Sequence, residues 1–300
     1  MSTSPDPGGQ TLPDSVSATG EKRFESLLLF ILALLPTSII AVLSVSSLPV
    51  LSEISLKIYD SFLLSGRSTA SANAPLIVDI DEQSLNEYGQ WPWPRFLVAE
   101  LLKKIQEEDP LAVGVDIMFS EPDRTSLSQI YKNIEAHFDI KIPEAQKLPK
   151  HLRENDSLLA DVLRQGNFVT SISFTPDRQI SDHNCTVHPL NIIIHQQTQK
   201  SSGDQEPLGQ ANRVICNLPL FDKAVSMNGF INVEADSDGI LRKVPLLMKY
   251  QDKILPHLSL ATLIAAFNPE TLVFRTSLYG TSGIVFDEHF IPLDNHGNFA

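Results

Sequence analysis

Residues 76–122 read LIVDIDEQSLNEYGQWPWPRFLVAELLKKIQEEDPLAVGVDIMFSEP, and this stretch decides the expected fold. Residues 76–80 form a short apolar run that ends among acidic residues, which predicts a buried strand, and residues 96–105 show helical periodicity. Residues 112–117 form a second apolar, β-branched run. A strand, a helix and a strand therefore follow one another, and we expect a right-handed parallel βαβ crossover.

The sequence after this unit repeats the pattern and then changes to hairpins. Residues 155–164 predict a helix capped by Asn155 or Asp156, and residues 167–174 predict a third strand. A polar surface excursion follows over residues 176–213, with one short strand at 191–195. The C-terminal part predicts a hairpin of 229–235 with 240–250 around the turn 236–239, a helix at 258–267, and a hairpin of 283–286 with 290–293. The predicted class is α/β: a mixed sheet with a parallel βαβ core, helices packed on it and C-terminal antiparallel hairpins.

The chain before residue 76 divides into three segments by composition. Residues 1–23 are rich in Ser, Thr, Pro and Gly, and we expect a disordered tail because they have too little apolar surface to fold. Residues 24–52 predict one transmembrane helix, since no charge occurs from 26 to 52 and ~20 apolar residues suffice to span the hydrocarbon core. Residues 53–64 continue the helical spacing and predict a stalk. Lys22 and Arg23 precede the span, which favours a cytoplasmic tail and an outer position for everything after about residue 53.

The overall charge excludes one class of partner. The 300 residues contain 36 acidic and 23 basic side chains and have a net charge of -13, whereas nucleic-acid binding requires clustered Lys and Arg. The two cysteines, Cys185 and Cys216, leave two alternatives open. They form one disulfide if this region lies outside the cytoplasm, or they remain two thiols, because spacing alone does not supply the bridging geometry.

Three carboxylates mark the predicted strand ends. Asp79 and Asp81 follow the first run and Asp116 ends the second, which is where an open α/β sheet places its ligands. The three groups would hold a divalent cation or accept hydrogen bonds from a polar ligand. In the alternative, Asp81 caps the next helix, and Asp79 or Asp116 binds loop amides or Arg95.

A stiff aromatic block lies between those two runs. Trp91 and Trp93 alternate with prolines and lead into Arg95, whose guanidinium suits a bidentate pair with a carboxylate. As a recognition wall the block would suit a planar or cationic ligand. As scaffold it would be a packed lid that fixes the start of the following helix.

Two further function classes fit parts of the sequence. An apolar strand that ends in Asp-x-Asp also begins aspartate-nucleophile phosphatases, in which Asp79 would attack phosphorus and Asp81 would act as acid and base. The chain lacks the later lysine and the acidic Mg²⁺ motif of such enzymes, so we expect no catalytic residue. A membrane-anchored envelope protein that binds other proteins fits the same anchor and α/β region.

The order of short motifs resembles the CHASE type-2 domain, an extracytoplasmic sensory module of bacterial receptors. The resemblance rests on these motifs in sequence order: IVDIDEQSL, GQWPWPR, AVGVDIMFSEPD, NDSLLADVL with GNFV, GFINVEADSDGILRKVPLL and HFIPLDNHG. Together they cover most of the chain after the predicted anchor.

The resemblance implies a sensory domain over residues 53–300 that is C-terminally incomplete. It implies a receptor in the inner membrane, with the N-terminus in the cytoplasm and the domain in the periplasm. Such a domain is normally followed by further membrane helices and a cytoplasmic output, namely a nucleotide cyclase, a histidine kinase or a serine/threonine kinase. We expect the membrane, an unidentified extracytoplasmic ligand and a second copy as partners, and no cofactor.

Overall fold

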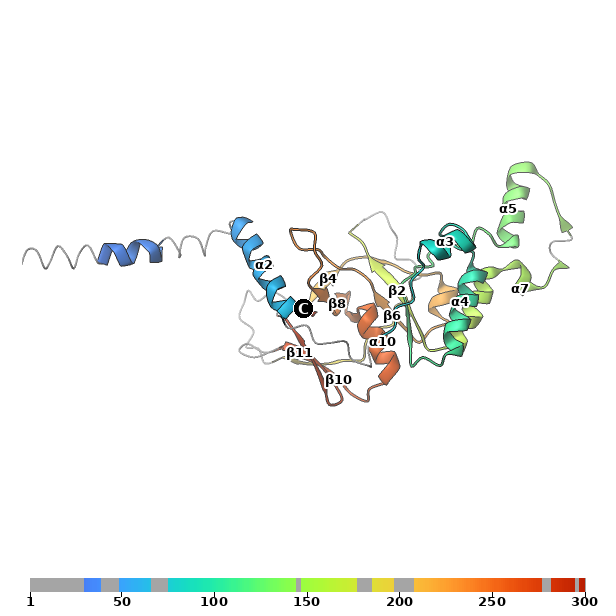
Figure 1. Ribbon diagram of the computed structural model, residues 1–300. Helices are drawn as coiled ribbons and strands as arrows, with labels where there is room; N and C mark the ends of the chain where they lie inside the picture. Colours follow the sequence, from blue (N-terminus) through green and yellow to red (C-terminus); the bar gives the residue numbers. More distant parts are fainter. Residues whose placement is uncertain are drawn as a thin grey trace, which may run out of the picture. The chain divides into compact units, whose positions relative to one another are not determined.

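The computed structural model separates the chain into two units, Met1–Leu76 and Ile77–Ala300. It describes residues 30–38, 49–65, 75–143, 147–176, 185–196, 208–276, 282–294 and 297–299. Figure 1 traces these residues and labels the helices and strands.

The first unit is helical at residues 30–38 and 49–65. Residues 30–38 form one helical segment, and α2 spans Pro49–Ser65, which confirms the helix predicted over 53–64. Among the described residues, no helix is long and apolar enough to cross a membrane. The predicted tail at 1–23 and residues 24–29 and 39–48 of the predicted span lie outside the described residues. The transmembrane helix and the attachment of the stalk to it therefore stay predictions.

A parallel sheet forms the centre of the second unit. β2 (Phe168–Phe174) pairs in parallel with β1 (Val113–Val115) and with β6 (Met227–Phe230). β5 (Val214–Ile215) pairs antiparallel with the end of β2. The chain passes from β1 to β2 through α8 (Asn155–Gln165), so the predicted parallel α/β core is confirmed.

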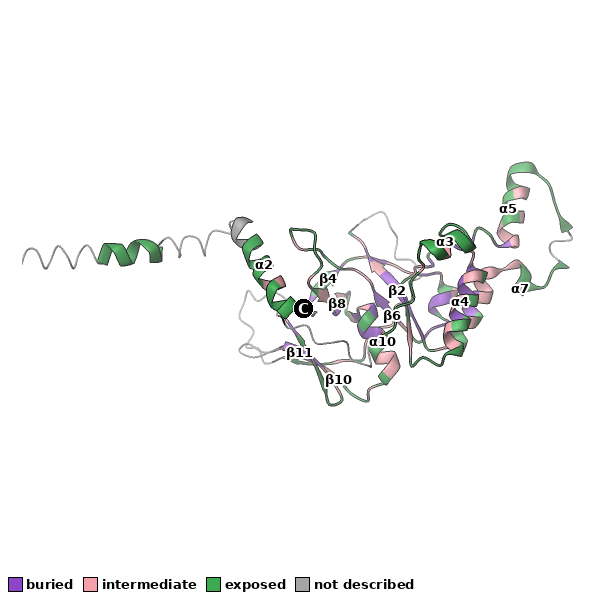
Figure 2. Cartoon of the chain, viewed as in Figure 1, coloured by how far each residue is buried: buried purple, intermediate pink, exposed green. Residues whose placement is uncertain are grey.

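Helices cover both faces of this sheet. Successive residues of a strand point to opposite faces, so neighbours on β2 pack against different helices. Phe168 of β2 is buried in the cluster with α4 (Arg95–Glu107) and α8. Its neighbour Val169 packs instead with residues of α10 (Leu258–Phe267). Purple, buried segments of β2 and α10 mark this core in Figure 2.

The predicted strand at 76–80 is wrong. Residues 75–80 have no strand or helix, and Leu76 and Ile77 are 89% and 85% exposed. An apolar run indicates a hydrophobic segment, but it does not show which strand, if any, that segment pairs with. In the described residues, β1 pairs with β2 alone. The helix predicted at 96–105 is present as α4, but without the first strand the predicted crossover from 76–80 to 112–117 does not form.

The helix at 155–164 is confirmed, but its predicted caps are not. Glu154 occupies the N-cap position of α8 and makes no side-chain cap hydrogen bond. Asn155 and Asp156 are the first helical residues, and their side chains bind the loop after β1 instead. Three further helices of this unit are α3 (Glu82–Tyr88), α5 (Leu127–Phe138) and α7 (Lys150–Arg153).

Smaller sheets form the C-terminal part. The strand order β12, β11, β10, β3 corresponds to His289–Leu293, Ser282–Phe286, Leu272–Thr276 and Ile193–Gln196. A second sheet has the order β4, β8, β9, which are Gly209–Ala211, Leu247–Tyr250 and Lys253–Pro256. β7 (Val244–Pro245) pairs with β13 (Asn298–Phe299). The last predicted hairpin and the predicted helix at 258–267 are confirmed.

The hairpin predicted from 229–235 and 240–250 is wrong. The turn itself forms, since Gly239 N donates to Asp236 O at 2.8 Å. The flanking segments pair elsewhere, however: β6 pairs with β2, and β8 pairs with β9 and β4. A buried apolar strand such as β6 gains more from a place in the parallel sheet than from its sequence neighbour.

Candidate functional site

The three predicted carboxylates do not share one set of contacts. Asp81 caps α3, because Ser84 N and Ser84 Oγ both donate to its Oδ1 at 2.8 Å. These hydrogen bonds lower the pKa of Asp81. Asp79 and Asp116 are exposed. The described residues contain no group of three or more His, Cys, Asp or Glu side chains that could hold a metal ion.

The aromatic block packs against its own surroundings. Trp93 is 7% exposed, its Nε1 donates to Gly89 O at 2.7 Å, and its ring meets the edge of Tyr88 at 5.6 Å between centroids. Trp91 precedes a cis peptide bond to Pro92 and is 41% exposed. These contacts fix the start of α4 and favour the scaffold interpretation of the block.

Arg95 binds partners that the sequence did not suggest. Its Nε lies 3.6 Å from Asp156 Oδ1, and its Nη2 donates to Glu121 O at 3.3 Å. The guanidinium carbon lies 4.6 Å from the centroid of the Phe119 ring, which adds a cation–π contact. The side chain thus ties α4 to α8 and to the loop after β1.

Asp123 is the centre of that loop. Its carboxylate accepts from Arg95 N at 3.0 Å, Thr125 N at 2.9 Å and Asn155 Nδ2 at 2.8 Å. Burial is the largest influence and raises the pKa of Asp123, but the hydrogen bonds together outweigh it and lower that pKa. For Asp156 burial prevails and raises the pKa against the hydrogen bond from Asp123 N and the charge of Arg95. Arg95, Asp123 and Asp156 therefore form a structural network, in which Arg95 Nε and Asp156 Oδ1 face each other as an ion pair without a hydrogen bond.

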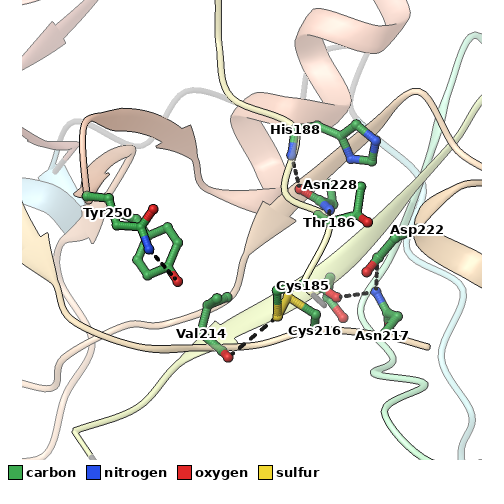
Figure 3. Close-up of a disulfide and its surroundings, with 11 residues drawn as sticks. Cys185, Thr186, His188, Val214, Cys216, Asn217, Asp222, Asn228 and Tyr250 are labelled. Atoms are coloured by element: carbon green, nitrogen blue, oxygen red, sulfur yellow. Dashed lines mark hydrogen bonds between the residues drawn. A yellow bond between two sulfur atoms is a disulfide. The ribbon is translucent and has the colours of Figure 1, made fainter. Parts of the chain in front are cut away.

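A second polar group lies deeper, on the face of the parallel sheet that carries α9 (Pro219–Asp222). We call Thr170, Asn217, Asp222 and Asn228 the Asp222 cluster; all are buried, and Asp222 is 0% exposed. Thr170 and Asn228 are register partners on β2 and β6. Asn217 Nδ2 donates to Asp222 Oδ1 at 3.1 Å (Figure 3).

Two atoms of this cluster lack partners within the described part of the chain. They are Asp222 Oδ2 and Thr170 Oγ1. Buried polar atoms are normally hydrogen-bonded, so these two atoms are exceptions. Burial raises the pKa of Asp222 to about 6, while the amides of Asn217 and Asn228 act in the opposite direction. The group is therefore poised to change charge close to neutral pH.

A short segment covers the cluster, and we call residues 185–190 the strap. Cys185 forms a disulfide with Cys216, which resolves the alternatives left open by the sequence. Figure 3 shows the bridge beside Asn228, whose Nδ2 donates to Thr186 O at 3.0 Å and whose Oδ1 accepts from His188 N at 3.1 Å. Burial lowers the pKa of His188. One buried amide thus holds the middle of the strap.

A comparison with known protein families matches the CHASE2 domain to residues 35–299. The chain belongs to the CHASE2 family. CHASE2 domains are sensory, non-catalytic domains typical of the extracytoplasmic sensor regions of signalling proteins. Neither the curated proteins nor the solved structures contain a match to this CHASE2 chain.

The sequence identified the scaffold of the CHASE2 domain better than its buried polar chemistry. Trp93 and Arg95 were singled out and are both buried, but the acidic partner of Arg95 is Asp156 on α8 rather than a strand-end carboxylate. Asp222 gave no sequence signal except an Asn-x-x-x-x-Asp spacing in an apolar context. Only the folded chain shows that α9 buries this carboxyl.

Proposed function

We propose that this chain is the extracytoplasmic sensory input region of a membrane-bound signal-transduction receptor. The observation that carries the proposal is the CHASE2 match over residues 35–299, because this family is typical of such regions. The Cys185–Cys216 disulfide supports an oxidising compartment, since disulfides persist outside the cytoplasm. The uncharged run at residues 26–52 supports an anchor in the inner membrane.

In this proposal the signal passes from the sensory domain to an output enzyme. An extracytoplasmic ligand shifts the domain between two packings, and α2 carries the shift toward the membrane. A second copy of the chain is a partner because such relays act between paired helices. The output is a cytoplasmic nucleotide cyclase, histidine kinase or serine/threonine kinase.

Topology reporters test the placement of the domain. A phosphatase reporter that is active only outside the cytoplasm, fused after Ser65, should be active in cells. Activity restricted to a reporter that works in the cytoplasm would overturn the proposal. Alkylation of intact cells should also find Cys185 and Cys216 oxidised in the full chain.

The identity of the output requires the coding sequence itself. Sequencing the transcript beyond the codon for Ala300 should reveal further hydrophobic spans followed by a cyclase or kinase domain. A stop codon at that point would instead favour a membrane-anchored binding protein.

A further inference from the structure

One of the smaller sheets ends in an open edge at β3. This strand is the last in the order β12, β11, β10, β3, and it pairs in parallel with β10 through residues 193–196. Figure 1 labels β10 and β11, the two central strands of the sheet. Within the described residues no strand pairs with the outer edge of β3. The backbone groups on that edge can therefore form a ladder with one more strand.

An apolar row crosses the buried face of this sheet and ends on β3. In register order its members are Ile291, Ile284, Phe274 and Ile194. Directly paired residues point to the same face, so these side chains adjoin one another across the four strands. Ile284 and Phe274 are 0% and 2% exposed, whereas Ile194 is 46% exposed. The apolar face of the sheet therefore reaches its edge strand and is left uncovered there.

A second apolar row crosses the opposite face. Its members in register order are Phe290, Val285, Val273 and Ile193. The two valines are half-buried, and Ile193 is 61% exposed. Because successive residues of a strand point to opposite faces, β3 presents an exposed isoleucine on each side of the sheet. A strand that continues both rows needs consecutive apolar residues.

The edge also lacks the features that usually protect an edge strand from pairing. Such edges commonly carry charged residues or proline, and β3 has neither. Residues 183–199 contain no Asp, Glu, Lys or Arg, although the whole chain has a net charge of -13. Two copies of an acidic chain repel each other over most of their surface, so an uncharged segment is where they can approach closely.

We propose that β3 is the contact with a second copy of this chain, and that the two β3 strands pair antiparallel around a two-fold axis. Ile193 and Ile194 supply the consecutive apolar residues that the edge requires, so the strand is complementary to itself. Directly opposite residues share a face, so the axis places one residue opposite its own copy. That residue is Ile194, because this register joins the two buried rows. Each Ile193 then lies opposite the His195 of the other copy.

This inference rests on the proposed function for the statement that a second copy is a partner, and it adds the surface that the two copies share. The contact is small, because β3 has four residues, whereas specific interfaces normally bury at least ~1,200 Å². Attachment to one membrane offsets the small area, since it raises the effective concentration of each copy near the other. The full-length chain in its membrane is therefore the form to test.

Cysteine cross-linking in isolated membranes tests the pairing, with the Cys185–Cys216 disulfide kept intact. Under an oxidant, Ile194→Cys should form a disulfide-linked dimer, because each new thiol lies opposite its own copy. His289→Cys is the matched control: His289 is exposed on β12, the opposite edge of the same sheet, and this variant should stay unlinked. No dimer from Ile194→Cys, equal amounts of dimer from His289→Cys, or a linked product that contains a different protein would each overturn the inference.

A second variant keeps the inference testable if Ile194→Cys does not fold. His195→Cys changes an exposed side chain, and a short bismaleimide should link it to its copy across the axis. Addition of Ile194→Lys should abolish this link because it sets two positive charges opposite each other, whereas Ile194→Val should preserve it. A link that survives Ile194→Lys would contradict the pairing. A topology reporter that places the domain in the cytoplasm would remove the proposed function and leave the β3 cross-links unaffected.

Discussion

Replacement of Asp222 by Asn should change how stability depends on pH, by an amount that follows from the buried carboxyl. The pKa of Asp222 in the folded chain is about 6, whereas an unfolded aspartate has a pKa of about 3.9. The folded state therefore binds more protons between these values. Because each pKa unit corresponds to about 1.4 kcal/mol, stability should fall by about 3 kcal/mol as pH rises from below 4 to above 6.

The Asp222→Asn variant lacks this titrating group, so its stability should not show the fall with rising pH that the Asp222 carboxyl causes. The free energy of unfolding of Asp222→Asn, relative to wild type, should increase by about 3 kcal/mol from low pH to neutral pH. Other titrating groups, among them Asp156 and His188, contribute equally to both proteins and cancel. A constant offset from the altered hydrogen bond with Asn217 changes the intercept and not the slope.

Urea unfolding followed by tryptophan fluorescence measures this difference. Trp93 is buried and reports loss of the core, and the disulfide should be kept intact in both proteins. Asp161→Asn is the matched control, because Asp161 is an exposed carboxyl on α8 and should show little pH-dependent difference. A wild-type to Asp222→Asn difference that stays constant across the pH range would refute the reasoning.

Three further substitutions or treatments test other parts of the fold by urea unfolding. Arg95→Met should lower the free energy of unfolding by about 3 kcal/mol, because it leaves the half-buried carboxylate of Asp156 without its ion pair. Arg124→Met removes an exposed ion pair and should lower it by less than about 1 kcal/mol. Equal losses in the two variants would contradict the Arg95 network. Reduction of the Cys185–Cys216 disulfide, which closes a separation of 31 residues, should lower the free energy of unfolding by about 3 to 4 kcal/mol by the chain-entropy argument. An unchanged urea midpoint after reduction would exclude the bridge. Gly229→Ala should lower the free energy of unfolding by more than about 2 kcal/mol, since the new methyl group would lie 2.6 Å from a backbone atom of α10. Gly209→Ala is the control and should be tolerated, because the nearest atom to its new methyl group is 3.6 Å away.

The sequence predicted elements with strong periodicity and failed where pairing is decided by distant residues. α10 was predicted with its observed bounds, and the hairpin of β11 and β12 was also recovered. Periodicity depends on neighbouring residues, so it survives in the sequence. The choice of β2 as the partner of β6, by contrast, depends on helices that bury both strands, and no local pattern encodes that choice.

Among the candidate site residues, too, the sequence predicted local contacts and missed contacts between distant residues. Asp81 as a cap follows from a local spacing, and Ser84 lies three residues away as such a cap requires. The network of Arg95 requires Asp123 and Asp156, which are 28 and 61 positions distant, so the sequence could offer only the charge and not its partner. The raised pKa of Asp222 could not be predicted from the sequence, because it arises from the burial of this residue in the folded chain.

The motifs that carry the family resemblance build the scaffold, and the Asp222 cluster lies outside them. GQWPWPR, AVGVDIMFSEPD and NDSLLADVL contribute Arg95, Asp123 and Asp156 to one network, so three separated motifs have one structural explanation. Asn217 and Asp222 belong to none of these motifs. The titration of Asp222 therefore depends on residues outside the motifs that build the Arg95 network. A variant with an apolar residue in place of Asp222 should therefore keep the Arg95 network and lose the fall in stability that ionisation of Asp222 causes.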